Sequence, residues 1–547
     1  MQSLWKKSLA VSLLATAMTA TGLTSLNTWA AEVPAGVTLA TKQTLQLQIG
    51  DNPKTLDPNL TSENVGTTIV DNLFEGLTTY DAEGKIVPAG AVSWTHTPDN
   101  KVWTFKLRQD AKWSDGTPVT AQDYVASWRR LVDPNTASEY SFYLADLGVV
   151  NAAKITDGKE KVENLGVQAL DDYTLQVTLE TPVPWFIEAT PLANLAPVPS
   201  KLLAEGKWPN FSNLVSNGPY VLTYAMPNEK YVVTKNPQYY NASKTIITEA
   251  TFNVVRSSND AYKRFQAGDL DAFLVENPQL KRKLKEESHD QYKVVISPGA
   301  NVNFYTFNLS KPPFNNLDVR KALLLAVDTK EMAQKVFLDN VIPTSLWVSP
   351  AIPGANSLKQ SAYFDEPITQ RVKQAQELLA QAGYSASNPL KFTINYNSSD
   401  TNKMVAIMLQ AQFKKTFGNT VDISINNREW STFLSERLTG AYTFYRMGWN
   451  ADYYEPSTFY SIWTSTNPTN TGGYKSVAYD KLFQDLYTTD NANQRLELYQ
   501  KMNDLLNEDV VGIPLFSPLI MSLTVNNLHG YVNDDTVRRL YNMYLTK

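Results

Sequence analysis

The chain has 547 residues, of which 43% are hydrophobic and 19% charged, and its formal net charge is −5. This composition is ordinary for a globular protein, and the mildly acidic charge argues against nucleic acid, which binds to basic faces. Because the sequence holds no cysteine, disulfides, cysteine-ligated zinc, iron–sulfur clusters and thiol catalysis are excluded.

Residues 1–30 have the pattern of a secretory signal peptide. Lysines at positions 6 and 7 precede an apolar stretch over 9–23, and Thr28 and Ala30 are small residues where a signal peptidase reads. We therefore expect a mature chain of about 517 residues from Ala31, with a formal charge of −7 and two or three lobes. With no cysteine to carry a lipid after the signal, the mature protein is expected free in a bacterial periplasm, without a membrane anchor.

Hydrophobic periodicity predicts regular elements along the mature chain. Apolar and polar residues alternate over 44–49, 102–107, 174–179 and 391–396, which predicts strands. Helices are predicted over 121–132 with Thr120 as its cap, over 370–382 with Gly383 in a left-handed terminal position, and over 405–417. Strands separated by helices indicate mixed α/β lobes.

Motifs for catalysis are missing from the sequence. The three histidines lie at 96, 289 and 529, and none stands in a metal-binding or triad spacing. There is no Gly-x-Ser-x-Gly elbow, no His-Glu-x-x-His pair and no glycine-rich phosphate loop. We therefore expect neither an enzyme nor a cofactor or metal.

The last third of the chain carries an aromatic-rich run with an arginine at one end, Arg446-Met447-Gly448-Trp449-Asn450-Ala451-Asp452-Tyr453-Tyr454-Glu455-Pro456. On an extended backbone, at about 3.3 Å per residue, the charges of Arg446 and Asp452 would lie roughly 20 Å apart. A tri- to pentapeptide has a similar span, with a carboxylate for the arginine and an amine for the aspartate. A buried strand with charged ends has the same pattern.

Several separated motifs resemble the large peptide-type solute-binding proteins of ABC importers. The main one is a strand from Trp103 to Arg108, a turn on Asp115-Gly116-Thr117-Pro118, and a helix that includes Tyr124. The likeness spans the mature chain and continues in Leu73-Phe74-Glu75-Gly76-Leu77, Asn217-Gly218-Pro219-Tyr220, Asn236-Pro237-Gln238-Tyr239-Tyr240, Asp318-Val319-Arg320-Lys321-Ala322-Leu323, Trp449-Asn450-Ala451-Asp452-Tyr453 and Tyr479-Asp480-Lys481-Leu482.

This resemblance implies an α/β fold like that of the periplasmic binding proteins, of type II and in the large cluster-C form. Lobe I would comprise 31–87, 212–300 and 520–547. Lobe II would be inserted as 88–211, and lobe III would span 301–519. The ligand would lie extended between the lobes, enclosed by hinge closure, and would pair its backbone with protein strands.

The resemblance also implies roles for individual residues. Asp452 matches the acid that receives a peptide's α-ammonium, and Arg446 and Arg437 match arginines that meet its carboxylate. Glu75 matches an acid that lines the cavity, and Trp430 and Trp449 match aromatic residues of its wall. The backbone edges expected to pair with the ligand are those of Gly448, Asn450, Ala451, Gly76 and Leu77. For Arg437, Glu75 and the tryptophans, ordinary ion pairs and core packing fit the sequence equally well.

Four positions depart from the family pattern. Asn301 and Asn450 stand where relatives have two cysteines that form a bridge, so this crosslink is absent. Leu324 and Asn402 stand where relatives have a lysine and a histidine that serve peptides of different lengths. The cavity has therefore lost two cationic groups, and the family's length preference and breadth are not assumed.

The sequence thus predicts a monomeric periplasmic protein that captures short peptides and delivers them to an inner-membrane ABC permease. One alternative is a relative specialised for a single ligand, such as a murein tripeptide, a dipeptide or another small zwitterion. Another alternative, from a different class, is a periplasmic peptide hydrolase or a chaperone that holds peptides.

Overall fold

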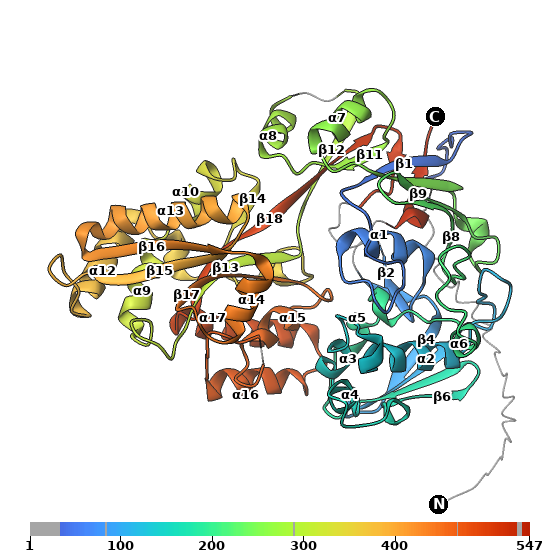
Figure 1. The fold of residues 1–547 in the computed structure, drawn as a ribbon, viewed down its shortest axis with the longest axis horizontal. Coiled ribbons are helices and arrows are strands. Elements are labelled where there is room, and N and C mark those ends of the chain that lie inside the picture. The colour runs from blue at the N-terminus through green and yellow to red at the C-terminus, as the bar shows by residue number, and fades with distance from the viewer. Residues whose placement is uncertain (1–32, 82–84, 288–289, 468, 533–538) are drawn as a thin grey trace, which may run out of the picture.

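The computed structural model describes residues 33–547, except 82–84, 288–289, 468 and 533–538 and the side chains at 400, 430 and 431. The expected signal peptide, residues 1–30, lies outside the described residues. Within the described part, strands and helices alternate and form mixed α/β lobes (Figure 1). Among the helices described there, none combines the length and hydropathy needed to cross a membrane.

The segment expected to form lobe II, residues 88–211, contains a separate antiparallel sheet in the order β4-β5-β7-β6. The predicted strand 102–107 and helix 121–132 are confirmed, and the strand predicted over 174–179 ends one residue earlier. The Asp123 carboxylate accepts a hydrogen bond from the Thr120 N–H at 2.8 Å, so the helix start is capped. The elements are β4 (Ala91–His96), β5 (Val102–Leu107), β6 (Val167–Asp171), β7 (Thr174–Thr178), α2 (Ala121–Val132), α3 (Tyr143–Asp146), α4 (Ala152–Thr156), α5 (Phe186–Ala189) and α6 (Ser200–Ala204).

Lobe I contributes strands to a twelve-stranded sheet that continues into lobe III. This sheet has the order β16-β15-β17-β13-β18-β11-β1-β10-β9-β8, with β12 and β14 also paired to β18. The predicted strand 44–49 is confirmed as β1. The elements of the segments expected to form lobe I are β1 (Thr44–Ile49), α1 (Asn64–Leu73), β2 (Thr78–Tyr80), β3 (Ile86–Pro88), β8 (Tyr220–Met226), β9 (Lys230–Lys235), β10 (Glu249–Val254), α7 (Ser258–Gln266), β11 (Ala272–Leu274), α8 (Pro278–Glu286), β12 (Tyr292–Pro298), β19 (Leu528–His529) and β20 (Tyr544–Leu545), together with the second half of β18.

Lobe III packs helices against the other half of the large sheet. The predicted strand 391–396 lies within β15, and Gly383 has φ +89° just beyond α12, as expected. Its elements are β13 (Asn301–Phe307), α9 (Leu317–Ala326), α10 (Thr329–Lys335), β14 (Val341–Pro343), α11 (Ala362–Asp365), α12 (Ile368–Gln381), β15 (Leu390–Asn397), α13 (Asp400–Phe417), β16 (Val421–Arg428), α14 (Trp430–Leu438), β17 (Phe444–Asn450), α15 (Ser457–Tyr460), α16 (Val477–Leu486) and α17 (Ala492–Glu508).

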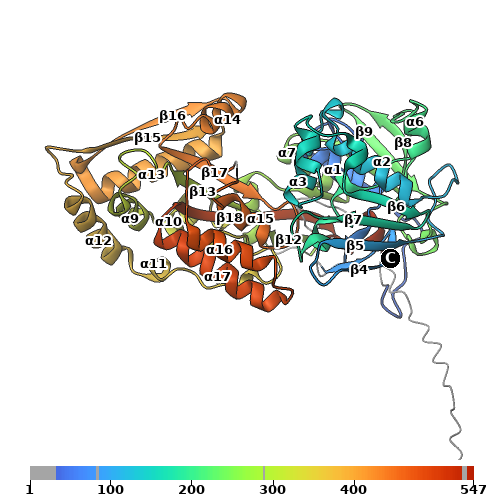
Figure 2. The ribbon, with the colours of Figure 1, turned by 90° about the horizontal axis from the view of Figure 1, so that it is seen from below.

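The strand β18 (Gly512–Val525) joins lobe III to lobe I, and Figures 1 and 2 show it running between the two halves of the molecule. Its first half pairs with β13 and β14 up to Pro518. From Leu519 onward it pairs with β12 and β11. The proposed boundary between lobes III and I at 519/520 therefore falls inside one continuous strand, and the lobe boundaries remain a proposal.

Candidate ligand-binding site

The strand β17 carries the run that begins at Arg446. It pairs antiparallel with β13 along its whole length, with Tyr305 opposite Arg446 and Asn301 opposite Asn450. On its other edge β15 pairs with it only at Phe444 and Tyr445. Within the described residues, this edge therefore has no strand partner from Arg446 onward. An open strand edge of this kind can accept an extended chain.

Two arginines lie near the end of this pairing, Arg446 on β17 and Arg437 on α14. The Nη2 atom of Arg446 donates to Asn303 Oδ1 at 3.0 Å, and Nη1 lies 3.4 Å from Asn397 Oδ1. Burial lowers the pKa of Arg446, and the nearby Arg437 of α14 lowers it further. The Nε atoms of both arginines are buried without a hydrogen bond among the described groups. Two neighbouring guanidinium groups with unused donors favour an anion such as a carboxylate.

Asp452 lies just beyond the end of β17 and is half-buried. Burial raises the pKa of its carboxyl from 3.8 to about 7, and the charge of Asp146 on α3 raises it further. The Thr458 hydroxyl opposes this shift, but its oxygen stands 3.5 Å from Oδ2 and the contact is weak. Among the described residues no cation pairs with this acid, and the ammonium group of a ligand can provide one.

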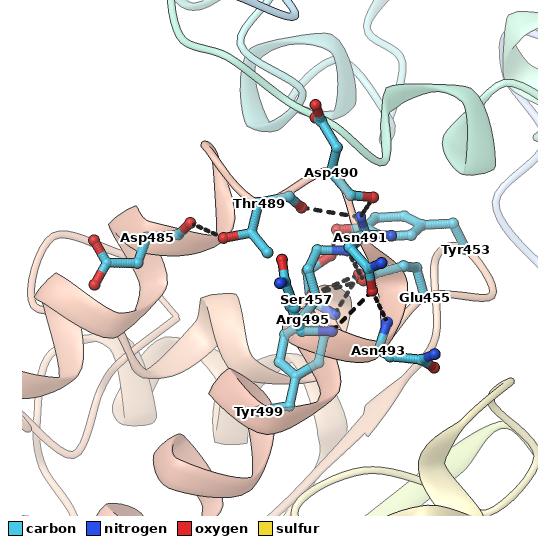
Figure 3. Close-up of polar contacts among 11 residues, drawn as sticks. Tyr453, Glu455, Ser457, Asp485, Thr489, Asp490, Asn491, Asn493, Arg495 and Tyr499 are labelled. Atoms are coloured by element: carbon cyan, nitrogen blue, oxygen red, sulfur yellow. Dashed lines mark hydrogen bonds and ion pairs between the residues drawn. The ribbon is translucent and has the colours of Figure 1, made fainter.

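A buried polar cluster fixes the segment that follows Asp452 (Figure 3). Arg495 on α17 and Glu455 form an ion pair at 3.3 Å, and both side chains are only 7% exposed. Glu455 also accepts hydrogen bonds from the Tyr499 hydroxyl at 2.7 Å and from the Ser457 N–H at 2.7 Å. Because these bonds satisfy the buried charges, the loop holds Asp452 in one place.

A cleft beside Asp452 is bordered by all three lobes. Its lining includes two residues expected in the site, Ala451 and Asp452, whereas Arg446 and Arg437 do not line it. The Tyr454 N–H donates a hydrogen bond to the Tyr80 hydroxyl at 3.3 Å, and the ring centroids of these two lining residues lie 5.0 Å apart. The remaining lining residues are Thr61, Ser62, Glu63, Asn64, Thr67, Asp71, Tyr140, Glu188, Pro191, Leu192, Ala193, Asn194, Tyr453 and Arg539.

Glu75 borders a smaller pocket that shares Asp71 and Arg539 with the main cleft. Its carboxylate accepts hydrogen bonds from the hydroxyls of Tyr239 at 2.5 Å and Tyr240 at 3.1 Å. Burial nevertheless raises the pKa of Glu75 to about 7. Glu75 is therefore held by its own lobe and lies next to the cleft.

The other expected site residues fall into different environments. The carbonyls of Gly76 and Leu77 accept hydrogen bonds from Gly90 and Ala91. The half-buried Trp449 donates its indole N–H to Thr458 at 3.2 Å. A Cβ at Gly448 would lie 3.2 Å from the Val302 carbonyl oxygen and 3.4 Å from Arg446 Nη2, so a larger residue would crowd the side of β17 that faces β13. Trp430 begins α14, and its side chain lies outside the part of the chain that the structure describes.

The four departures from the family pattern also have defined places. Asn301 donates a side-chain hydrogen bond to the exposed Asn450 opposite it, so the expected pairing of these positions is confirmed. Asn402 donates to Asn397 Oδ1 at 3.1 Å, and the same oxygen lies 3.4 Å from Arg446 Nη1. Leu324 is 5% exposed and belongs to the hydrophobic core of lobe III.

Sequence reasoning missed several groups around the charged ends. Asn303 and Asn397 hold the guanidinium of Arg446, and Thr458 contacts both Trp449 and Asp452. No motif marks these residues, because asparagine and threonine are common surface residues and their positions depend on the pairing of distant strands.

A family model for bacterial extracellular solute-binding proteins, family 5 Middle, matches residues 85–471. The chain belongs to this family. Its fold is the type II periplasmic-binding fold of these solute-binding proteins.

The similar proteins include binding proteins with different named ligands. A periplasmic oligopeptide-binding protein of Haemophilus influenzae is 38% identical over 94% of this chain and 96% of its own length. Its structure in complex with the peptide RPPGFSPFR covers 93% of this chain and 100% of the solved chain with a TM-score of 0.75. A probable deoxycholate-binding periplasmic protein of Escherichia coli is 38% identical over 90% of this chain and 92% of its own length.

A periplasmic murein tripeptide-binding protein in its unliganded open form gives a TM-score of 0.83. It is 36% identical, and the match covers 94% of this chain and 99% of the solved chain. The peptide complex, which is a different relative, gives a TM-score of 0.75.

Proposed function

We propose that this protein captures short peptides in extended conformation in the periplasm and delivers them to an ABC permease of the inner membrane. The observation that carries the proposal is the edge of β17 that has no described strand partner from Arg446 onward, together with Arg446 on the strand, the nearby Arg437 and Asp452 beyond the strand end. A free peptide has the matching charges, a carboxylate and an ammonium, at the ends of a backbone that can pair with a strand edge.

The binding energy in this scheme comes from groups that every peptide has. The ligand ammonium meets the Asp452 carboxylate, and each such charge-assisted hydrogen bond contributes on the order of 1.5–3 kcal/mol. The ligand backbone hydrogen-bonds to the edge of β17 that has no described strand partner from Arg446 onward. Side chains between the two ends contribute little to recognition, so many sequences are accepted.

No reaction of the ligand is part of this proposal. The charged groups of the site bind the two ends of the peptide, and closure of the lobes then removes the peptide from water. We propose that the protein acts as a monomer without a membrane anchor, a cofactor or a metal. The closed, loaded form is the one that the permease would receive.

A second candidate is a binding protein specialised for one small ligand. It is favoured by Leu324 and Asn402, which leave Arg446 and Arg437 as the cations at this end of the site. A fixed position for the carboxylate would select one ligand length. The names of the relatives, which include a murein tripeptide-binding and a probable deoxycholate-binding protein, are consistent with such specialisation in this family.

Mass spectrometry of the ligands released by denaturing the purified protein separates these candidates. A mixture of short peptides with varied sequences supports broad peptide capture. One dominant compound supports the specialised protein and contradicts the broad one. Peptide fragments that accumulate with time, when the protein is incubated with longer peptides, would instead indicate a hydrolase.

A further inference from the structure

The cleft beside Asp452 contains a second acid that lies on lobe II. Glu188, on α5, lines this cleft together with Asp452. Its Oε2 atom is fully buried and has no hydrogen-bond partner among the described groups. A buried carboxylate oxygen without a partner is costly, because the charged form loses its hydration without compensation. Glu188 therefore needs a cation or a donor from outside this part of the chain.

The other charged groups of the cleft are already used. Glu63 caps α1 and accepts hydrogen bonds from the N–H groups of Val65 and Gly66. Asp71 and Arg539 both have interactions of their own, although the Oδ2 atom of Asp71 is also buried without a hydrogen bond among the described groups. Arg539 also donates to the Tyr80 carbonyl at 3.1 Å. Among the described residues, no cation forms an ion pair with Asp452 or Glu188, and neither acid caps a helix as Glu63 does.

The surroundings of Glu188 also favour a cation beside it. Burial raises its pKa to about 7, and the charge of Glu455 raises it further, while Arg495 partly offsets both. The walls of the cleft include Tyr80, Tyr140 and Tyr453, whose rings and hydroxyls suit a cation. In the part of the cleft next to Glu188, called the recess below, a positive group would be stabilised by the Glu188 carboxylate and by the tyrosine rings.

We propose that the recess bordered by Glu188 takes the side chain of the ligand's first residue and favours a basic one, such as lysine or arginine. This inference rests on the proposed function, because Asp452 would hold the α-ammonium in the same cleft. The side chain of the first residue leaves the backbone next to that ammonium. A ligand with a basic first residue would thereby bring one cation to Asp452 and a second to Glu188.

The test compares Lys-Ala-Ala with norleucine-Ala-Ala, which has a similar chain but no side-chain charge. Calorimetric Kd values are measured for the wild type, for Glu188→Gln, and for Glu163→Gln, which changes an exposed acid elsewhere on lobe II. We expect the wild type and Glu163→Gln to bind the lysine peptide about tenfold more tightly. Glu188→Gln should lose this preference and still bind the norleucine peptide as before, within about twofold, which also shows that the variant is folded.

Two results would overturn the inference. The wild type could bind both peptides equally, or the lysine preference could survive in Glu188→Gln. In both cases the norleucine peptide still binds, so the proposed function stands without this subsite. Failure of the wild type to bind any free tripeptide would overturn the proposed function together with the inference.

Discussion

The ionised carboxylate of Asp452 destabilises the unliganded protein, and a bound ligand ammonium would remove this destabilisation. Its carboxyl has a pKa raised from 3.8 to about 7, first by burial and then by the charge of Asp146. Because the folded pKa lies above the unfolded value, ionisation of Asp452 favours the unfolded state. Its contribution therefore lowers the free energy of unfolding as the pH rises from about 4 to about 7. A ligand ammonium beside Asp452 would compensate the buried negative charge and restore the free energy of unfolding that its ionisation removes.

The substitution Asp452→Asn should stabilise the unliganded protein, because the amide keeps the shape without the buried charge. We expect the midpoint of thermal unfolding at pH 8 to rise by roughly 1–3 °C, and the gain to shrink at pH 4.5, where the wild-type carboxyl is protonated in the folded state. Differential scanning calorimetry of ligand-free samples at the two pH values measures this. An unchanged or lower midpoint at pH 8 would mean that Asp452 is not an uncompensated charge.

At the residue scale, the sequence singled out Arg446 and Asp452 through their spacing within one segment and through the family resemblance, and their role as the charged ends of the site stays a prediction. Asn303 contacts Arg446 only because β13 pairs with β17, which places residues separated by more than 140 positions side by side. Glu188 gave no signal, since an isolated acid in a short helix looks like a surface residue. Contacts of this kind need the folded chain.

The pairing of β13 with β17 offers a test at the scale of the elements. Asn301 and Asn450 are opposite each other in this pair and share a side-chain hydrogen bond. Opposite residues of antiparallel strands have Cβ atoms about 4.5–5.5 Å apart, close to the range that a disulfide needs. Asn301 and Asn450 thus stand where, according to the family resemblance, relatives have a disulfide bridge.

The double substitution Asn301→Cys with Asn450→Cys should restore this crosslink. We expect a disulfide to form on oxidation and to increase the free energy of unfolding by about 2–4 kcal/mol, because it joins residues far apart in the sequence. Urea denaturation with and without a reducing agent measures the difference, and Asn301→Cys alone is the control. Two free thiols after oxidation would show that the register of β13 and β17 is wrong.

Helices and strands were predicted correctly where the hydrophobic pattern and the cap lie within the same short segment. The helix 121–132 has the predicted bounds, whereas α13 begins at Asp400 instead of 405 because Ser399 caps it and its first turn is polar. The long strand β18 was not predicted. Pro514 and Pro518 interrupt its sequence, and proline usually marks an edge or a break in a strand.

The whole molecule is held together through β18, which pairs with strands of lobe III in its first half and with strands of lobe I in its second. A continuous strand between two lobes lets them rotate while their backbone connection is kept. The lobe boundaries came from the family resemblance, because hydrophobic patterns do not reveal where one core ends and another begins.

Ligand binding should make the molecule more compact. The described arrangement gives a TM-score of 0.83 to an unliganded open form and 0.75 to a peptide complex. We therefore expect the radius of gyration in small-angle X-ray scattering to decrease when a saturating tripeptide is added. The same tripeptide with both ends blocked is the control and should leave the radius unchanged. A radius that stays constant with a bound free peptide would exclude closure.

The most direct measurement compares one tripeptide in three forms, free, N-acetylated and C-amidated, by calorimetry. The wild type should prefer the free form over both others. Asp452→Ala should weaken binding of the free form tenfold or more, which is about 1.4 kcal/mol per tenfold, and remove its advantage over the acetylated form. Arg446→Ala should instead remove the advantage over the amide. If the wild type binds all three forms equally, the site does not recognise the two charged ends of a peptide.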